Sequence, residues 1–227
     1  MAKRWTTLYK YVPLKCVVDI LDNHRLYLSD GKNFNDPFEI TVTDESGNIR
    51  YIDNLHILSL TNSYQNNLIW SHYTDSHKGI CLTVKVPADC VYPICYVKER
   101  VKENTNLDEL IAKNIKWRKK NLKKPFSLLS NDKKVAYIKN RKWEYENEYR
   151  IIFNKYDESG LIYENGKWYM SVKIKNVYLG VNFEKNDQKT IDEILSACKR
   201  NNINVTEMVL SNSDYSVKPG GKYNVNI

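Results

Sequence analysis

Short apolar segments with the periods of strands and helices follow one another irregularly along the chain, and this pattern limits the fold more than any other feature. Strands are predicted at residues 8–11, 26–28, 56–61, 80–86, 149–153, 177–179 and 205–210. Helices are predicted at residues 13–21, 66–74, 106–119, 132–139 and 187–199. Residues 161–170 have the pattern of a hairpin with Asn165-Gly166 at its turn. Because strands and helices do not alternate regularly, we expect an α+β fold, in one domain over residues 1–227, with short mixed or antiparallel strands and peripheral helices.

Two classes of protein are disfavoured by the sequence: membrane-spanning and secreted proteins. The longest uncharged apolar runs, such as residues 79–84, are far shorter than the ~20 residues that a membrane span needs. The N-terminal residues contain no apolar stretch of the kind that secretory signals have. The five cysteines are irregularly spaced, which disfavours a zinc site and favours reduced, buried thiols. We therefore expect a cytoplasmic protein that binds no metal, and the oligomeric state is left open.

Positive charge is concentrated in one lysine-rich segment. Residues 98–142 contain 15 Lys and Arg against 5 Asp and Glu, whereas the whole chain has a net charge of +8. Such an excess is typical of a surface that binds the phosphates of a nucleic acid, although solvated lysine-rich helices show it as well. The residues expected to contact nucleic acid are Lys113, Lys116, Arg118, Lys119, Lys120, Lys123 and Lys124.

The densest group of charged and aromatic residues lies at positions 143–150. On a strand, Glu146, Glu148 and Arg150 would share one face, because side chains alternate between the two faces. Two neighbouring carboxylates raise one another's pKa, whereas the arginine lowers the pKa of both. The arrangement is suited to a carboxylate that stabilises a developing cation or accepts a proton. An ordinary ion pair on an exposed strand is the alternative.

A second group of polar residues lies between positions 59 and 79. His72 and His77 are five residues apart, which is not the spacing of a metal-binding pair on one helical face. Either histidine could orient a substrate or transfer a proton, or could have a structural role only. Ser59 and Thr61 would place two hydroxyl groups on one face of a strand, a pattern that strands also show without any function.

Asn35 and Asp36 precede a proline, which makes them candidates for a helix cap. With Glu39 they could instead contribute to a metal site of the nuclease type. That alternative requires Asp36, Glu39 and Glu148 to converge, and no metal is predicted.

Four blocks of the sequence together resemble an uncharacterised bacterial family, the domain of unknown function 2971. They are Leu8-Tyr-Lys-Tyr11, Phe34-Asn-Asp-Pro-Phe-Glu39, Leu68-Ile-Trp-Ser-His-Tyr73 with Lys78-Gly79, and Trp143-Glu-Tyr-Glu-Asn-Glu-Tyr-Arg150. They occur in the order of the family and cover most of residues 8–180. The family has no settled activity, so the resemblance implies membership without a function.

The same sequence is also similar, more distantly, to ADP-ribosyltransferases, which have a polar residue on an early strand, a strand with Ser or Thr, and a late Glu-x-Glu. The likeness implies that Glu148 stabilises the cation formed as nicotinamide leaves NAD and that Glu146 orients or deprotonates the acceptor. It implies an NAD-binding role for Tyr9, Lys10, Ser59, Thr61, Trp70, Tyr73 and Arg150. The chain departs from the known subclasses at Lys10, where they have Arg or His, and at Ser59-Leu-Thr61, where they have Ser-Thr-Ser.

Three hypotheses of function follow. The first is an ADP-ribosyltransferase-like enzyme that uses NAD as cosubstrate, in a bacterial toxin or an antiphage defence system. The second is a nucleic-acid-binding or metal-dependent nuclease-type defence protein that uses the basic segment 98–142. The third is a non-catalytic sensor module.

Overall fold

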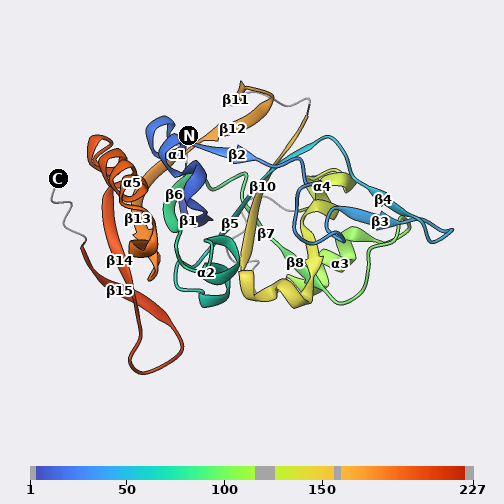
Figure 1. Ribbon diagram of the computed structural model, residues 1–227. Coiled ribbons are helices and arrows are strands. Elements are labelled where there is room, and N and C mark those ends of the chain that lie inside the picture. Colours follow the sequence, from blue (N-terminus) through green and yellow to red (C-terminus); the bar gives the residue numbers. More distant parts are fainter. Residues whose placement is uncertain (1–3, 116–125, 156–159, 223–227) are drawn as a thin grey trace. The chain divides into compact units, whose positions relative to one another are not determined.

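A computed structural model describes residues 4–115, 126–155 and 160–222 (Figure 1). Its contacts divide the chain into two compact units, and each unit combines separate segments of the sequence. The first unit consists of Met1–Arg4, Tyr27–Ser59 and Pro87–Met170, and the second of Trp5–Leu26, Leu60–Val86 and Ser171–Ile227. The expectation that residues 1–227 form one domain stays a prediction.

The second unit is built on a sheet with the strand order β15-β14-β13-β6-β1. These strands are β1 (Trp5–Val12), β6 (Ile80–Pro87), β13 (Lys173–Leu179), β14 (Asn204–Leu210) and β15 (Val217–Lys222). Strand β13 pairs in parallel with β14 and antiparallel with β6. The sheet is therefore mixed, as the sequence predicted.

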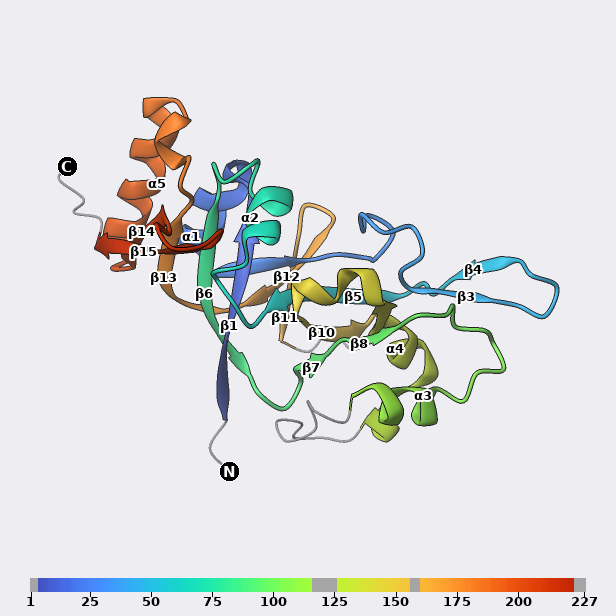
Figure 2. The same cartoon turned by 90° about the horizontal axis from the view of Figure 1, so that it is seen from below.

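Helices on the second unit have the expected apolar faces. The short helix η1 (Leu14–Cys16) leads into α1 (Val17–Asn23), and α1 contacts α5 (Gln188–Arg200), which also contacts β14 (Figure 2). Helix α2 (Asn67–Tyr73) begins after Asn66, whose side chain accepts hydrogen bonds from the N–H groups of Leu68 and Ile69. A further single turn, η5 (Phe183–Lys185), precedes α5. Apolar residues at helical spacing, such as Ile191, Ile194 and Leu195 in α5, are buried because they pack into the core.

The first unit contains several small sheets around its own core. Strand β10 (Glu148–Asn154) lies between β5 (Leu55–Thr61) and β7 (Tyr92–Pro93), and β8 (Cys95–Val97) pairs in parallel with β9 (Ile138–Asn140). The other strands are β3 (Thr41–Thr43), β4 (Ile49–Tyr51) and β11 (Leu161–Glu164). The unit boundaries at residues 26 and 171 fall within β2 (Arg25–Leu28) and β12 (Lys167–Ser171). The helices are α3 (Leu107–Asn114), η3 (Phe126–Leu128), α4 (Asn131–Ala136) and η4 (Arg141–Glu146). Ile57, Ile94, Tyr137 and Ile152 are among the residues that form its hydrophobic core.

The α+β class and the hairpin at Asn165-Gly166 are confirmed. Two predicted elements are corrected. The helix expected at 132–139 ends at Ala136, and Lys139 belongs to strand β9. The helix expected at 106–119 is observed as α3, over Leu107–Asn114, and its remainder from residue 116 onward lies outside the described residues. Of the basic residues expected to contact nucleic acid, only Lys113 is described, and its side chain is exposed.

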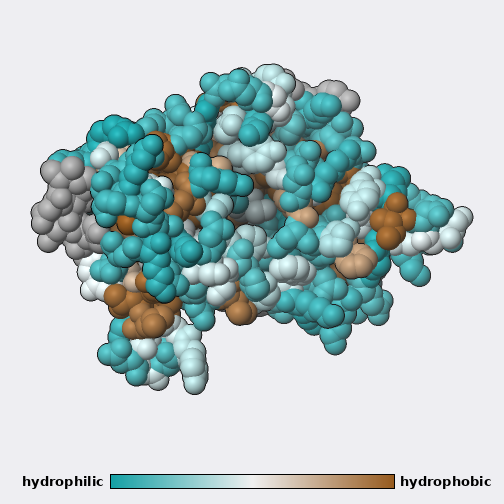
Figure 3. All heavy atoms as spheres, in the orientation of Figure 1, coloured by the Kyte–Doolittle hydropathy of each residue, from teal (hydrophilic) through white to brown (hydrophobic). Residues whose placement is uncertain are grey.

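Hydrophilic residues predominate on the face seen in Figure 3, and apolar residues form separate small patches on it. No helix within the described ranges is long and apolar enough to cross a membrane. All five cysteines are free, and three of them (Cys81, Cys95 and Cys198) are buried. The expectation of buried thiols is therefore correct for these three and wrong for Cys16, which is exposed.

Candidate functional site

A tight turn at residues 36–40 directs Glu39 into the first unit. The Asp36 carboxylate accepts a hydrogen bond from the N–H of Phe38 (3.0 Å), and the Asp36 carbonyl accepts one from the N–H of Glu39 (3.1 Å). Asp36 thus caps a turn, whereas the sequence predicted a helix cap. Ile40 follows with a φ of +57°, a strained conformation for a β-branched residue. Such strain is maintained only where the surroundings enforce it, and it is common at functional sites.

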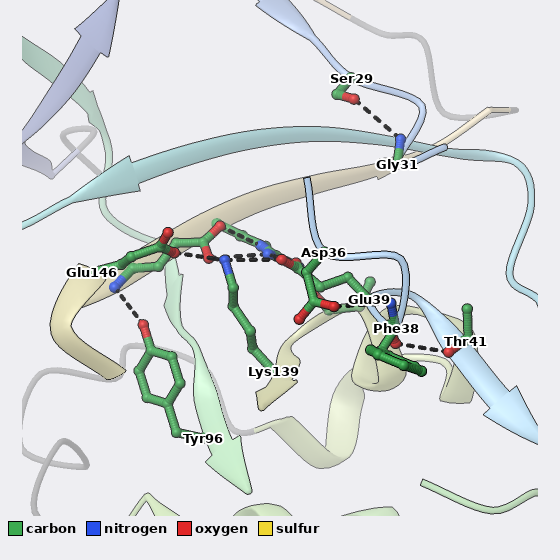
Figure 4. Close-up of polar contacts among 12 residues, drawn as sticks. Ser29, Gly31, Asp36, Phe38, Glu39, Thr41, Tyr96, Lys139 and Glu146 are labelled. Carbon is green, nitrogen blue, oxygen red and sulfur yellow. Dashed lines mark hydrogen bonds and ion pairs between the residues drawn. The ribbon is translucent and has the colours of Figure 1, made fainter. Parts of the chain in front are cut away.

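Lys139 lies at the centre of a group of three carboxylates. It projects from β9 and is buried, with its Nζ 2.9 Å from Glu39 Oε1, 2.6 Å from Glu146 Oε2 and 3.1 Å from Glu148 Oε2 (Figure 4). The ammonium also lies 4.9 Å from the centre of the Trp143 ring. The strand, rather than the predicted helix, brings this side chain to the carboxylates.

Glu146 and Glu148 reach the same lysine from two sides of a turn. Glu146 ends helix η4, Asn147 has the left-handed φ of +46°, and Glu148 begins strand β10. The N–H of Glu148 donates a hydrogen bond of 2.9 Å to the hydroxyl of Tyr96 on β8, which fixes the start of the strand. The expectation that Glu146 lies on the strand is therefore wrong, whereas Glu148 and Arg150 do share a face of β10.

Arg150 completes a closed ring of charges. Its Nε and Nη2 lie 2.6 Å and 3.0 Å from the two carboxylate oxygens of Glu148, and Nη2 also donates to Glu39. Nη1 donates to the carbonyl of Ala136 at 2.7 Å, and the guanidinium lies 4.9 Å from the centre of the Phe34 ring. We call the set Glu39, Lys139, Glu146, Glu148 and Arg150 the charge cluster. All five side chains are buried.

The charge cluster contains more negative than positive groups. Burial alone would raise the pKa of Glu148, but Arg150, Lys139 and a hydrogen bond from Ser59 outweigh burial and lower this pKa to about 2. Burial alone would lower the pKa of Lys139 and of Arg150. The neighbouring carboxylates outweigh burial and raise both pKa values above the usual ones. With three carboxylates and two cations, the formal charges of these five side chains add up to minus one.

Two members of the charge cluster, Glu39 and Lys139, line a pocket of about 210 Å³. We call it the Glu39 pocket. Its other lining residues are Asp36, Phe38, Ile40, Thr41, Val97, Glu99, Arg100, Val101, Val135, Ile138 and Asn140. Glu146 and Glu148 do not line it, although they hold Lys139 in place.

Arg100 is an exposed cation that its neighbours hold in one position at this pocket. Its Nε donates to the hydroxyl of Thr43 (3.1 Å) and its Nη2 to the hydroxyl of Thr41 (2.9 Å). The guanidinium also lies 5.1 Å from the centre of the ring of Phe38, a residue that is 60% exposed. A stacked and hydrogen-bonded guanidinium of this kind is suited to binding a phosphate. The pocket thus combines an anionic part at Glu39 with a cationic part at Arg100.

The residues that the sequence analysis selected divide between the two units. Glu146, Glu148, Arg150, Ser59, Asn35 and Asp36 belong to the first unit. Tyr9, Lys10, Thr61, Trp70, Tyr73, His72 and His77 belong to the second. In the first unit, Ser59 contacts Glu148 by a side-chain hydrogen bond, and Asp36 lines the Glu39 pocket.

The selected residues of the second unit make contacts of their own. The ring of Trp70 lies 5.0 Å from that of Tyr11 and 6.1 Å from that of His77. His77 Nε2 is 3.1 Å from the hydroxyl of Ser71, and burial lowers the pKa of His77. His72 is exposed at the end of α2.

Sequence reasoning missed two residues of the site. Lys139 was assigned to a helix and counted only as part of the basic segment, and Arg100 was counted in the same way. A signal for Lys139 was present, because it directly follows a short apolar stretch, Val135–Ile138, a position that is atypical of a solvated lysine. Nothing in the local sequence of Arg100 distinguishes it from the other basic residues nearby.

The donor set does not fit a metal ion. Within the described ranges, no group of three His, Cys, Asp or Glu side chains has the geometry of a metal site. The ammonium of Lys139 lies between the three carboxylates, where a divalent cation would have to bind.

Residues 69–151 match the sequence model of a family described as "Protein of unknown function (DUF2971)". This part of the chain includes Lys139, Glu146, Glu148 and Arg150, whereas Glu39 precedes it. The match relates the chain to an uncharacterised family of domains. No curated protein and no solved structure matches the chain.

Proposed function

We propose that the protein is an enzyme of the ADP-ribosyltransferase kind, which breaks the bond between ribose and nicotinamide of NAD at the Glu39 pocket. One observation carries the proposal. A buried charge cluster of three carboxylates and two cations adjoins, through Glu39, a pocket whose other part holds a positioned arginine. A ligand with a cationic ring at one end and phosphates at the other complements this distribution of charge.

The chemistry of the reaction calls for a fixed negative charge. When the bond between ribose and nicotinamide breaks, its electron pair leaves with nicotinamide and the ribose acquires the character of an oxocarbenium ion. A carboxylate already held in place by ion pairs stabilises that charge without reorganising. The acceptor then forms the new bond to ribose and releases a proton to a carboxylate.

The contacts favour Glu39 as the carboxylate beside the ribose, because Glu39 lines the pocket. Glu148 and Arg150 then act as positioning residues, since their ion pairs hold Glu39 and Lys139. The direct catalytic roles that the sequence analysis gave to Glu148 and Glu146 stay predictions.

The pocket fits NAD in part. At about 210 Å³ it is smaller than the roughly 300–1,000 Å³ of sites that enclose a whole small ligand. It would therefore hold the nicotinamide end, with Arg100 near the pyrophosphate and the adenosine outside. Roles for Tyr9, Lys10, Thr61, Trp70 and Tyr73 in holding NAD stay predictions.

The test is transfer of labelled ADP-ribose from NAD to a mixture of protein, RNA and DNA acceptors. Wild type is expected to transfer the label, and Glu148→Gln is expected to lose transfer because the ring of charges is broken. Glu144→Gln is the matched control, because it makes the same chemical change outside the charge cluster. The side chain of Glu144 is half-exposed, and its ion pair with Arg141 is long (3.8 Å). The control should transfer label like wild type.

Each hypothesis gives a different result in this experiment. Label on RNA or DNA would support both the enzyme hypothesis and a role for the basic segment 98–142 in binding the nucleic-acid acceptor. No turnover, and no rise in the melting temperature with NAD, would contradict the proposal. Cleavage of nucleic acid with a divalent metal would favour the nuclease instead, and a specific ligand that raises the melting temperature without turnover would favour a sensor. A toxin or antiphage role stays a prediction.

A further inference from the structure

One face of the sheet in the second unit presents aromatic and basic side chains that lie outside the Glu39 pocket. Its register is defined by β13 and β6, where Lys173 lies opposite Lys85, Asn176 opposite Thr83 and Tyr178 opposite Cys81. Directly opposed residues share a face, and residues 81, 83 and 85 follow one another at every second position of β6, so all of these side chains lie on the same side of the sheet. The other side carries buried residues such as Leu82, Val84 and Val177.

Three tyrosines gather on this side of the sheet, where Tyr178 lies opposite the small residue Cys81. Tyr64, from the connection between β5 and α2, stacks on Tyr178 with ring centres 4.3 Å apart and an angle of 3° between the rings. Tyr9 on β1 lies 5.1 Å from Tyr64 and 6.4 Å from Tyr178. None of the three tyrosines is fully buried, so part of each residue remains accessible. We call this surface, with Lys85, Lys173 and Trp5, the tyrosine face.

The charge of the tyrosine face is positive. Lys173 is exposed and its Nζ lies 5.1 Å from the centre of the Trp5 ring. Lys85 is opposite it on β6. Within the described residues, none of those on this side of β1, β6 and β13, nor Asn204 and Thr206 on β14, is Asp or Glu. Glu207 falls on the other side, because it lies opposite Leu179.

We propose that the tyrosine face binds single-stranded nucleic acid. Accessible aromatic rings on an open sheet stack on unpaired bases, and lysines beside them bind the phosphates. Tyr9 and Tyr64 provide the rings for stacking, and Lys85 and Lys173 provide the charges. The bases of a duplex cannot stack on the tyrosine rings, because they already stack on one another inside the duplex. This proposal does not depend on the proposed function.

The test is fluorescence anisotropy with labelled single-stranded oligonucleotides of about 12 nucleotides, one of uridine and one of 2′-deoxyuridine, and with a duplex of the same length. Wild type should bind single strands more tightly than the duplex, and the RNA and DNA arms show whether the 2′-hydroxyl matters. Tyr64→Leu keeps most of the apolar volume but removes the ring, and should weaken binding about tenfold, within the range for one lost base stack. Tyr64→Trp should retain binding.

The matched controls are exposed residues of the same unit that are not members of the tyrosine face. Tyr215→Leu changes a fully exposed tyrosine between β14 and β15 and should bind like wild type. Lys173→Met should reduce the slope of log affinity against log salt by about 0.7, the value for one phosphate contact on a single strand. Lys189→Met, on the exposed side of α5, should leave the slope unchanged.

Two results would overturn the proposal. One is absence of binding to single strands by wild type at low salt. The other is binding that Tyr64→Leu and Lys173→Met both leave unchanged, since the nucleic acid would then bind elsewhere, such as at the basic segment 98–142. Lys173 is exposed, so we expect Lys173→Met to fold like wild type. The second result can therefore be read from Lys173→Met alone if Tyr64→Leu does not fold.

Discussion

Arg150 is the residue on which the charge cluster depends most, because it contacts Glu39, Glu148 and the carbonyl of Ala136 while wholly buried. Arg150→Met would leave two carboxylates and a carbonyl without this partner in the interior. We expect the free energy of unfolding to fall by about 3–5 kcal/mol, the range for breaking one side of a buried ion pair. Unfolding in urea measures the change.

The matched control is Arg50→Met in the same unit. Arg50 forms an ion pair with Glu103 (3.0 Å), and the side chains are 57% and 41% exposed. Exposed pairs contribute about 0–1 kcal/mol, so the control should be nearly as stable as wild type. Equal losses in Arg150→Met and Arg50→Met would show that the charge cluster is not buried in solution.

The depressed pKa of Glu148 makes stability depend on pH in a defined range. The pKa is about 2 in the folded state, against the usual 4.5. A lowered folded pKa contributes stability that is fully present above pH 4.5 and is lost as the pH falls toward 2. The difference corresponds to about 3 kcal/mol, since one pKa unit is about 1.4 kcal/mol.

Urea unfolding between about pH 6 and pH 3 measures this loss. In Glu148→Gln, which carries no titrating group at this position, the stability should be lower at neutral pH and should fall less steeply with acid. Glu144→Gln should follow wild type. Parallel curves for wild type and Glu148→Gln would contradict the account of this ion pair.

At the scale of elements, a glycine determines how two loops of the second unit meet. A Cβ on Gly180 would lie 2.0 Å from the carbonyl oxygen of His77 and 3.0 Å from that of Gly79. The N–H of Gly180 also donates to the Gly79 carbonyl (3.0 Å). The contacted atoms belong to the backbone and cannot move aside as the end of a side chain can. We therefore expect Gly180→Ala to lower the free energy of unfolding by about 1–3 kcal/mol or more, the cost of overpacking a core.

Gly221→Ala, on strand β15 of the same unit, is the control, because nothing lies within 4 Å of its added Cβ. Thermal unfolding of the two variants should give a clearly lower melting temperature for Gly180→Ala alone. Equal melting temperatures would mean that the two loops are not in contact as described.

The sequence predicted elements wherever their side chains had a clear period. Strands β5 and β6, helix α5 and the Asn165-Gly166 turn were all found from apolar spacing or turn residues. Strands β3, β4, β7, β8, β9 and β15 were missed, because most of them have only two or three residues and too few to show a period. Pairing partners far away in the sequence, rather than local preference, stabilise strands of this length.

The candidate site was predicted in part. The pairing of Glu148 with Arg150 followed from strand alternation, which is a local rule. The roles of Glu39 and Lys139 could not follow from any local rule, since they come from a turn and a strand about a hundred residues apart. Glu146 was selected for the wrong reason: the left-handed turn at Asn147, not a shared strand face, brings it to Lys139.

At the scale of the whole molecule, the two compact units are interleaved in the sequence. A chain that ends at Met170 would lack β13, β14, β15 and α5, and β6 would lose its partner β13. We expect this truncated chain to lose cooperative thermal unfolding and to bind a dye for exposed apolar surface, because Leu82 and Val84 would no longer be buried. A truncated chain with a sharp unfolding transition would contradict this expectation.

The central claim is that the charge cluster beside the Glu39 pocket acts on NAD, and release of nicotinamide from NAD tests it most directly. Wild type and Glu144→Gln should release nicotinamide at the same rate. Glu39→Gln should lose most of kcat with a smaller change in KM, because the lost carboxylate acts on the charge that develops in the transition state. Release by a folded Glu39→Gln at the wild-type rate, or no release by wild type, would contradict the claim.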